Sequence, residues 1–121
     1  MAAKHLLIVD DDPRNIFALK ALLKSRAYSC ASCQSAAEAL ALLQTGPQAD
    51  AILLDMMMPD MDGYEAIPVL RGLPGYADTP IFAVTAQAMV GDRERCLQAG
   101  ATDYIAKPID VDRLFQLLST I

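Results

Sequence analysis

The chain has 121 residues, of which 54% are hydrophobic, and its 15 acidic and 10 basic residues give a net charge of −5. This size describes one compact domain over residues 1–121 and excludes a two-domain enzyme. The negative charge argues against direct contact with nucleic acid or an anionic membrane surface. No apolar run approaches the roughly 20 residues of a membrane-spanning helix. Three cysteines, an odd number, fit a reducing compartment, so we expect a cytoplasmic protein.

Short apolar runs alternate along the chain with segments of helical periodicity. Three of these runs are apolar at every position, which is typical of strands covered on both faces in a parallel sheet. Two weaker runs complete a set of five predicted strands. In chain order, the five are Leu6–Val9, Tyr28–Cys33, Ala51–Leu54, Ile81–Val84 and Asp103–Ala106.

The segments between the runs carry helix signals. The first helix is expected after Asp12-Pro13, a capping aspartate followed by a proline suited to the first helical turn. The second opens at Ser35 with a capping box and ends at Gly46-Pro47. The third contains Pro68 about one and a half turns from its expected start, which predicts a later start or a kink.

The last two helices complete the pattern. The fourth is expected from about Gln87 to Gly100, and the fifth opens at Asp110, after which apolar residues repeat at the helical period. The element order is therefore (βα)5. Parallel strands joined by right-handed helical crossovers form a doubly wound α/β fold. Such sheets bind ligands beyond the carboxyl ends of their strands, so the residues after each run are the candidate site.

Polar side chains follow four of the five runs. Asp10–Asp12 come after the first run, Asp55 after the third, Thr85 after the fourth and Lys107 after the fifth. Because the strands are parallel, these groups are expected to converge on one edge of the sheet. Gathered carboxylates repel one another, and a bound cation relieves that repulsion better than protonation does. Oxygen ligands completed by water suit Mg²⁺, for which Mn²⁺ would substitute.

Four motifs in this order resemble those of the response-regulator receiver domain, the phospho-acceptor module of two-component signalling. The motifs are Asp10-Asp11, Leu54-Asp55-Met56-Met57-Met58-Pro59-Asp60-Met61-Asp62-Gly63, Val84-Thr85-Ala86 and Lys107-Pro108. The resemblance extends from about His5 to Leu118. It implies a flavodoxin-like fold with a five-stranded parallel sheet in the order 2-1-3-4-5.

The resemblance also implies a role for each residue of the site. Asp55 would accept a phosphoryl group from a phosphohistidine. Mg²⁺ would bind to Asp55, Asp11 and the backbone carbonyl of Met57, and to Asp10 through water. Lys107 would hold a phosphoryl oxygen. Phosphoryl transfer needs positioning and charge neutralisation more than covalent chemistry, so the domain would catalyse its own phosphotransfer and dephosphorylation without being an enzyme for another substrate.

A conformational switch is implied as well. The Thr85 hydroxyl would bond to the phosphorylated form, and Tyr104 would then rotate inward. The face formed by the fourth helix, fifth strand and fifth helix would rearrange to bind a downstream effector or, in a phosphorylation-dependent dimer, a second copy. The phosphoryl donor would be a histidine kinase or a histidine phosphotransfer protein.

The resemblance also implies that two further positions set the lifetime of the phosphoryl group. Met57 cannot orient an attacking water by hydrogen bonding, which predicts slow dephosphorylation, whereas Gln87 could offer a polar contact. Cys30 and Cys33 match a redox motif in spacing, but in a strand they would face opposite sides. We therefore expect two ordinary thiols.

Other functions share parts of this pattern. A metal-dependent phosphatase acting through Asp55 commonly carries a second acid two residues further on, where this chain has Met57. A flavodoxin-like electron carrier needs a loop after the first strand that attracts phosphate, whereas Asp10–Asp12 would repel it. A degenerate receiver that binds partners without phosphorylation usually lacks a key residue, and all are present here. Both a free-standing regulator and a receiver from a hybrid histidine kinase fit the sequence.

Overall fold

A five-stranded parallel sheet forms the centre of the computed structural model, which describes residues 4–46, 48–86 and 91–121. The strand order is β2-β1-β3-β4-β5. This confirms the flavodoxin-like, doubly wound fold expected from the sequence. The strands are β1 (His5–Val9), β2 (Ser29–Cys33), β3 (Ala51–Asp55), β4 (Ile81–Thr85) and β5 (Asp103–Ala106).

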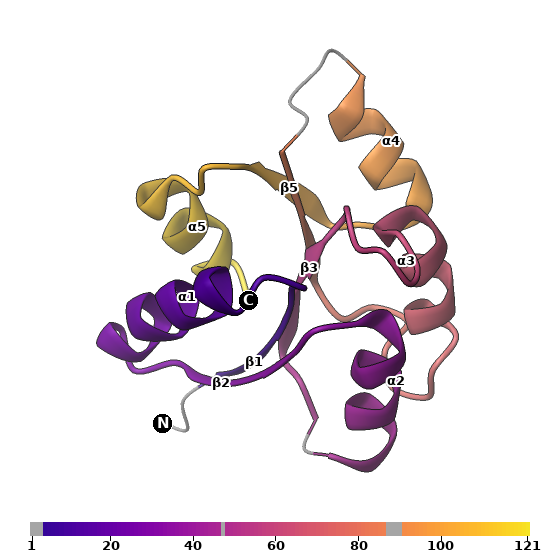
Figure 1. The fold of residues 1–121 in the computed structure, drawn as a ribbon, viewed down its shortest axis with the longest axis horizontal. Coiled ribbons are helices and arrows are strands. Elements are labelled where there is room, and N and C mark those ends of the chain that lie inside the picture. The colour runs from indigo at the N-terminus through magenta and orange to yellow at the C-terminus, as the bar shows by residue number, and fades with distance from the viewer. Residues whose placement is uncertain (1–3, 47, 87–90) are drawn as a thin grey trace.

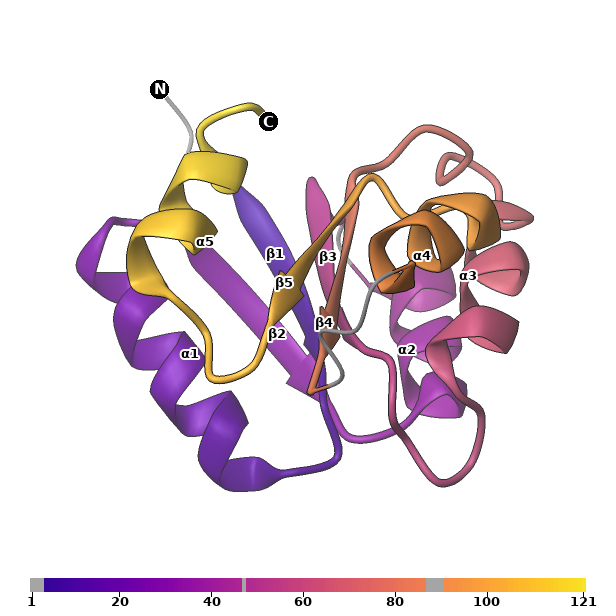
Figure 2. The same ribbon diagram turned by 90° about the horizontal axis from the view of Figure 1, so that it is seen from above.

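Helices cover both faces of the sheet, with α1 and α5 on one side and α2, α3 and α4 on the other (Figures 1 and 2). None of the helices in the described parts of the chain has the length and apolar character needed to cross a membrane. The helices are α1 (Pro13–Ser25), α2 (Ala36–Thr45), α3 (Gly63–Arg71), α4 (Asp92–Ala99) and α5 (Val111–Leu118).

The core consists of two apolar layers, one on each face of the sheet. Residues alternate between them along a strand, so Leu6 and Ile8 pack toward α1 and α5 while Leu7 and Val9 pack toward α2, α3 and α4. Strands buried on both faces explain why the central runs are apolar at every position. The two layers fix the sheet, and with it the relative positions of the strand ends.

The cysteines of β2 follow the same alternation. Cys30 packs against the α1 and α5 layer and Cys33 lies in the opposite layer, and neither forms a disulfide. Burial raises the pKa of the Cys30 thiol and raises that of Cys33 to about 11. A thiol with a raised pKa is a poor nucleophile near neutral pH. The expectation of two ordinary thiols is confirmed.

The predicted helix starts are confirmed by their caps. The Asp12 carboxylate accepts a hydrogen bond from the backbone N–H of Arg14 at 2.9 Å. The Ser35 hydroxyl accepts one from Glu38 at 3.1 Å, and Asp110 caps α5 in the same way. These bonds satisfy backbone donors that have no partner inside the helix.

The third and fourth helices differ in how well their ends were predicted. The later start of α3 is wrong, because the Asp62 carboxylate caps this helix at 2.9 Å and Pro68 lies in its interior. Burial of Ile67 and Leu70 on the inner face outweighs the unfavourable proline. The end of the fourth helix at Gly100 is confirmed, but its expected start at Gln87 lies outside the described residues, as does the role expected for Gln87.

Candidate functional site

The strand ends bring four predicted residues to one edge of the sheet. Asp10 follows β1, and Asp55 is the last residue of β3. Thr85 ends β4, and Lys107 follows β5. Asp10 and Asp55 are each only 3% exposed and Thr85 is 4% exposed, although all three are polar. Buried polar groups at the carboxyl edge of a parallel sheet are the arrangement that the sequence predicted.

Local backbone contacts hold the two buried carboxylates in place. Oδ1 of Asp10 accepts a hydrogen bond from the N–H of Asp12 at 2.9 Å, and Oδ1 of Asp55 accepts one from the N–H of Met57 at 3.0 Å. The other oxygens face Lys107, whose Nζ lies 3.4 Å from Oδ2 of Asp55 and 3.8 Å from Oδ2 of Asp10. One oxygen of each carboxylate is therefore fixed by the chain, and the other faces a cation.

The acidic side chains outnumber the cation that contacts them. Asp10, Asp11 and Asp55 each place a carboxylate oxygen within 4.8 Å of the others. Among the described residues, Lys107 is the cation that pairs with this cluster, through Asp10 and Asp55. A compact set of oxygen ligands with excess negative charge fits a hard divalent cation such as Mg²⁺, which keeps several waters. The donor set contains no thiolate or imidazole of the kind that Zn²⁺ prefers.

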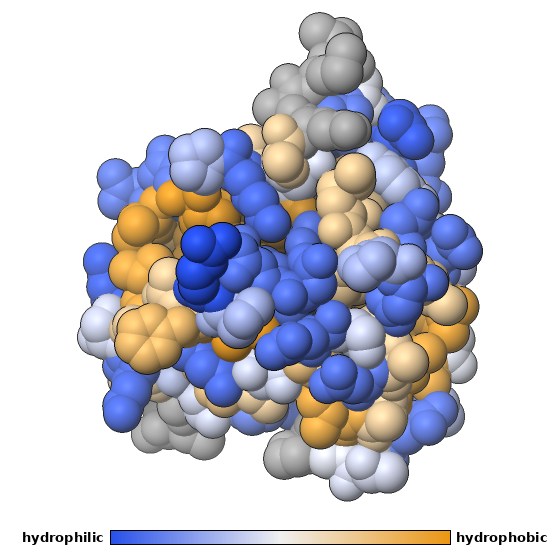
Figure 3. All heavy atoms as spheres, in the orientation of Figure 1, coloured by the Kyte–Doolittle hydropathy of each residue, from blue (hydrophilic) through white to orange (hydrophobic). Residues whose placement is uncertain are grey.

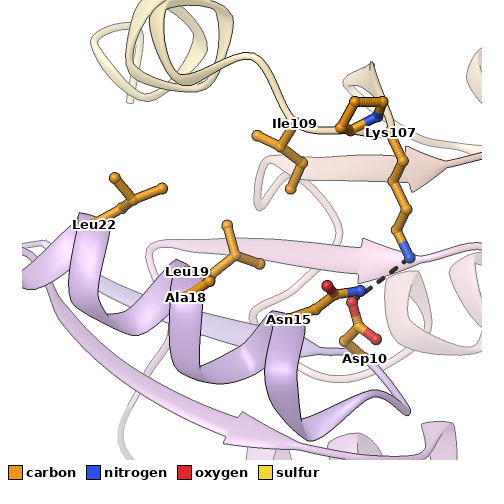
Figure 4. Close-up of a pocket in the computed structure, with 8 residues that line it drawn as sticks. Asp10, Asn15, Ala18, Leu19, Leu22, Lys107 and Ile109 are labelled. Atoms are coloured by element: carbon orange, nitrogen blue, oxygen red, sulfur yellow. Dashed lines mark ion pairs between the residues drawn. The ribbon is translucent and has the colours of Figure 1, made fainter.

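Lys107 is positioned by the sheet. Its backbone N–H donates to the carbonyl of Thr85 at 2.8 Å, which extends the pairing of β4 with β5 by one residue. The peptide bond between Lys107 and Pro108 is cis. The side chain then runs toward Asp10 (Figure 4). The lysine thus reaches the site from the strand next to Thr85.

A cavity of about 470 Å³ opens beside the carboxylates, between α1 and the residues after β5 (Figure 4). Its polar end is formed by Asp10, Asn15 and Lys107, and its walls are mostly apolar. In Figure 3, hydrophobic side chains gather over α1 and α5 and border a hydrophilic region. The residues that line the cavity are Asp10, Asn15, Ala18, Leu19, Leu22, Lys107, Pro108 and Ile109.

This cavity was not predicted from the sequence. Leu22 lies partly exposed at the cavity wall. A signal was present, because Asn15, Leu19 and Leu22 have the spacing of one helix face and the polar residue lies at the end nearest Asp10. Periodicity alone does not show that a second element leaves this face uncovered.

The remaining predicted residues lie close to the same edge. Tyr104 is partly buried in β5, against the α2, α3 and α4 layer, and pairs with Ala83, two residues before Thr85. Met56 and Met58 are buried, while the side chain of Met57 is 54% exposed. Met57 therefore points away from the layer that buries both of its neighbours. An apolar, solvent-facing side chain thus lies two residues after Asp55.

The sequence resembles known proteins over nearly its whole length. Residues 6–119 match the family described as Response regulator receiver domain. The chain is 42% identical over 116 residues to the signal transduction histidine-protein kinase BarA of Escherichia coli K12, which covers 96% of the chain but only 12% of the kinase. It is 36% identical over 118 residues to an uncharacterized 14.6 kDa protein of Leptolyngbya boryana, covering 98% of the chain and 89% of that protein.

Solved structures give the same result. The receiver domain of a sensor histidine kinase from Pseudomonas aeruginosa superposes with a TM-score of 0.88 at 37% identity, covering 98% of this chain and 97% of that one. That structure has a magnesium ion coordinated in its active site cleft. A chemotaxis response regulator of Vibrio cholerae superposes with a TM-score of 0.90 at 27% identity, covering 98% of each chain.

Proposed function

Because the chain belongs to the response regulator receiver domain family and is a phospho-acceptor receiver, we propose that Asp55 receives the phosphoryl group. The observation that carries this proposal is the position of the Asp55 carboxylate. It is buried at the end of the central strand β3, it is held by the N–H of Met57, and it lies 3.4 Å from Nζ of Lys107. Asp10 makes the same two kinds of contact, but its Oδ2 lies farther from Nζ of Lys107, at 3.8 Å.

The proposed reaction is a transfer between two proteins. A carboxylate oxygen of Asp55 attacks the phosphorus of a phosphohistidine, the bond between phosphorus and the imidazole nitrogen breaks, and an acyl phosphate forms on Asp55. Such a transfer depends on in-line positioning and on neutralising the charge of the phosphoryl oxygens. Lys107 supplies a positive charge at the required place, and the cavity beside α1 leaves the carboxylate edge accessible from that side.

We propose that the acidic cluster holds Mg²⁺, with Asp11, Asp55 and the backbone carbonyl of Met57 as ligands and Asp10 bound through water. Mn²⁺ would substitute. When bound, the ion would neutralise charge on the cluster and on the phosphoryl oxygens. The close approach of the three carboxylates supports this proposal. So does the magnesium ion in the related receiver from Pseudomonas aeruginosa.

The proposed partners follow from the family. A histidine kinase or a histidine phosphotransfer protein would be the phosphoryl donor, and a downstream effector would bind the face formed by α4, β5 and α5.

We propose that residues 1–121 act as one domain in the cytoplasm. The domain would catalyse its own phosphotransfer and dephosphorylation but no reaction of another substrate. The three unpaired cysteines agree with a reducing compartment.

We propose that Thr85 and Tyr104 form the switch. Thr85 ends the strand next to β3, so a bond between its hydroxyl and a phosphoryl group on Asp55 needs only a local movement. Tyr104 lies one strand further on and is only partly buried, so an inward rotation would bury more of its ring. A contact made only in the phosphorylated form is what biases a two-state element.

Intact-mass measurement after incubation with acetyl phosphate and Mg²⁺ tests the proposal. Wild type is expected to gain one phosphoryl group. Asp55→Asn and wild type with a chelator are expected to gain none. Asp60→Asn is a matched control, because Asp60 is an exposed carboxylate on the same loop, outside the acidic cluster. An adduct on Asp55→Asn would show that another residue is the nucleophile, and no adduct on wild type would contradict the function.

A further inference from the structure

A second group of charges lies on the face formed by α4, β5 and α5. Oδ1 of Asp103, the first residue of β5, lies 3.4 Å from Nε of Arg93 on α4 and 3.2 Å from Nη2 of Arg113 on α5. The same oxygen accepts the backbone N–H of Tyr104 at 2.8 Å. In Figures 1 and 2, α4 and α5 lie on opposite sides of β5, so this carboxylate connects two helices across the strand. We call these three charged residues the Asp103 clamp.

The two ends of α4 are held in different ways. At the C-terminal end, the guanidinium of Arg71 donates to the carbonyl of Gly100 through Nη2 at 2.8 Å and through Nε at 3.2 Å. At the N-terminal end, the cap residue Gly91 provides no side-chain hydrogen bond, and α4 buries only Asp92 and Cys96 along its length. The N-terminal turn also carries Arg93, and its ion pair with Asp103 ties this end of the helix to β5.

We propose that the Asp103 clamp opposes the switch, by stabilising the arrangement of α4 and β5 that precedes phosphorylation. This inference rests on the proposed function. Tyr104 packs against the α2, α3 and α4 layer and is only partly buried, so an inward rotation would bury more of its ring. The oxygen that accepts the backbone N–H of Tyr104 also contacts both arginines, so a movement of α4 relative to β5 changes the distance between Arg93 and Asp103. A contact that differs between two states biases the equilibrium between them.

The two halves of the clamp contribute unequally. Arg113 is on α5, which is anchored by the buried Leu114, Leu117 and Leu118. Arg93 is on α4, which buries only Asp92 and Cys96. Loss of the Arg93 pair therefore releases the less well anchored element, whereas loss of the Arg113 pair leaves α5 in place. By linkage, a variant that weakens the arrangement before the switch strengthens binding of a phosphoryl group or its mimic.

The expected change in affinity is small because the Arg93 side chain is exposed to solvent. The side chain of Arg93 is 51% exposed, and exposed ion pairs change an equilibrium by about two- to five-fold at most. Salt screens such pairs, so the effect is expected at low ionic strength and not at high ionic strength. The Asp103 clamp therefore makes a small contribution to the equilibrium between the two states of the switch.

The experiment measures the apparent affinity for the phosphoryl mimic beryllofluoride, with Mg²⁺, at low and high salt. Arg93→Gln is the test variant. Arg95→Gln is the matched control, because it removes the same charge from the same helix but its guanidinium lies 4.6 Å from the centre of the Tyr64 ring. Arg93→Gln is expected to bind about two- to five-fold more tightly than wild type at low salt, with no difference at high salt. Arg95→Gln is expected to match wild type.

Asp103→Asn is a second test of the same pair. It is expected to bind beryllofluoride more tightly, and adding Arg93→Gln to it is expected to have no further effect, because the ion pair of Arg93 is already lost when Asp103 is neutral. Equal affinities for Arg93→Gln and Arg95→Gln, or weaker binding by Arg93→Gln, would overturn the clamp while leaving the proposed function intact. If wild type neither binds beryllofluoride nor gains phosphate from acetyl phosphate, the proposed function falls and the clamp falls with it.

Discussion

At the carboxyl edge of the sheet, three carboxylates lie within 4.8 Å of one another, and the lysine that contacts them supplies one positive charge. At the amino-terminal edge, the guanidinium of Arg71 donates to the backbone carbonyls of Tyr76, Thr79 and Gly100. Burial lowers the pKa of Arg71, and these carbonyls replace the water that burial removes. The carboxyl edge therefore keeps an excess of negative charge. At the amino-terminal edge, the guanidinium of Arg71 has its hydrogen bonds made by carbonyls of the same chain.

The two edges of the sheet therefore have different roles, one in function and the other in stability. Excess negative charge at the carboxyl edge is neutralised by a group from outside the chain, such as a divalent cation. A guanidinium surrounded by carbonyls needs no ligand and instead joins α3 to the ends of the loops that lead into β4 and β5. Substitutions at the first edge should change chemistry, and substitutions at the second should change stability.

The largest effect is expected from Asp11→Asn. Loss of a proposed direct ligand should lower the rate of phosphorylation by acetyl phosphate by about 100-fold or more, because a metal ion supplies several kcal/mol of transition-state stabilisation. Asp12→Asn is the matched control, since asparagine caps a helix as well as aspartate does and Asp12 lies outside the cluster. Equal rates for the two variants would exclude a special role for Asp11.

The next largest effect is expected from Arg71→Met. This change removes a charged donor from three backbone carbonyls and should lower the free energy of unfolding by about 2–4 kcal/mol. Urea unfolding measures it, and Arg14→Met, at a side chain that is 90% exposed, should change stability by no more than about 0.5 kcal/mol. The phosphorylation rate of folded Arg71→Met should match wild type. A large loss of that rate without a loss of stability would contradict the division between the two edges.

A smaller effect of opposite sign is expected from Asp10→Asn. Removing one of the gathered negative charges should raise the free energy of unfolding in Mg²⁺-free buffer by about 1 kcal/mol. Asp10 is the better choice for this test because its distance to Lys107 is longer than that of Asp55. Adding Mg²⁺ should stabilise wild type more than the variant and so reduce the difference. Destabilisation by Asp10→Asn in the absence of Mg²⁺ would show that repulsion does not dominate this edge.

The smallest effect is expected from Met57→Asn. An amide at this exposed position can orient an attacking water, which should shorten the lifetime of the phosphoryl group by about two- to ten-fold, the effect of one hydrogen bond. Decay of the phosphorylated protein after removal of acetyl phosphate, followed by intact mass, measures the lifetime. Met57→Leu keeps an apolar side chain and should decay like wild type. If Met57→Asn also decays like wild type, the apolar side chain does not set the lifetime.

Much of the functional edge could be predicted because its residues are local to strand ends. Asp10, Asp55, Thr85 and Lys107 each stand directly at or after an apolar run. Parallel strands present their carboxyl ends on one edge, so four local patterns specify one site. The caps at Asp12, Ser35 and Asp110 were predictable for the same reason, since each involves residues two or three apart.

The parts that were not predicted depend on contacts between residues far apart in the sequence. Arg71 reaches Gly100, 29 residues away, and Asp103 receives arginines from two different helices. Single arginines and aspartates on a helix or strand give no sequence signal for such pairs. Pro68 led to a wrong prediction for the start of α3, because proline is unfavourable inside a helix. In the structure, buried apolar side chains and a cap at Asp62 stabilise the helix despite the proline.

Chemical trapping of the phosphorylated residue tests the central claim most directly. Borohydride reduces an acyl phosphate on aspartate to homoserine, and peptide mapping then locates the changed position. After treatment with acetyl phosphate and Mg²⁺, we predict homoserine at position 55 alone, and none when Mg²⁺ is chelated. Reduction at Asp10, Asp11 or Asp60, or no reduction in protein whose mass shows a phosphoryl group, would contradict the assignment of Asp55 as the phospho-acceptor.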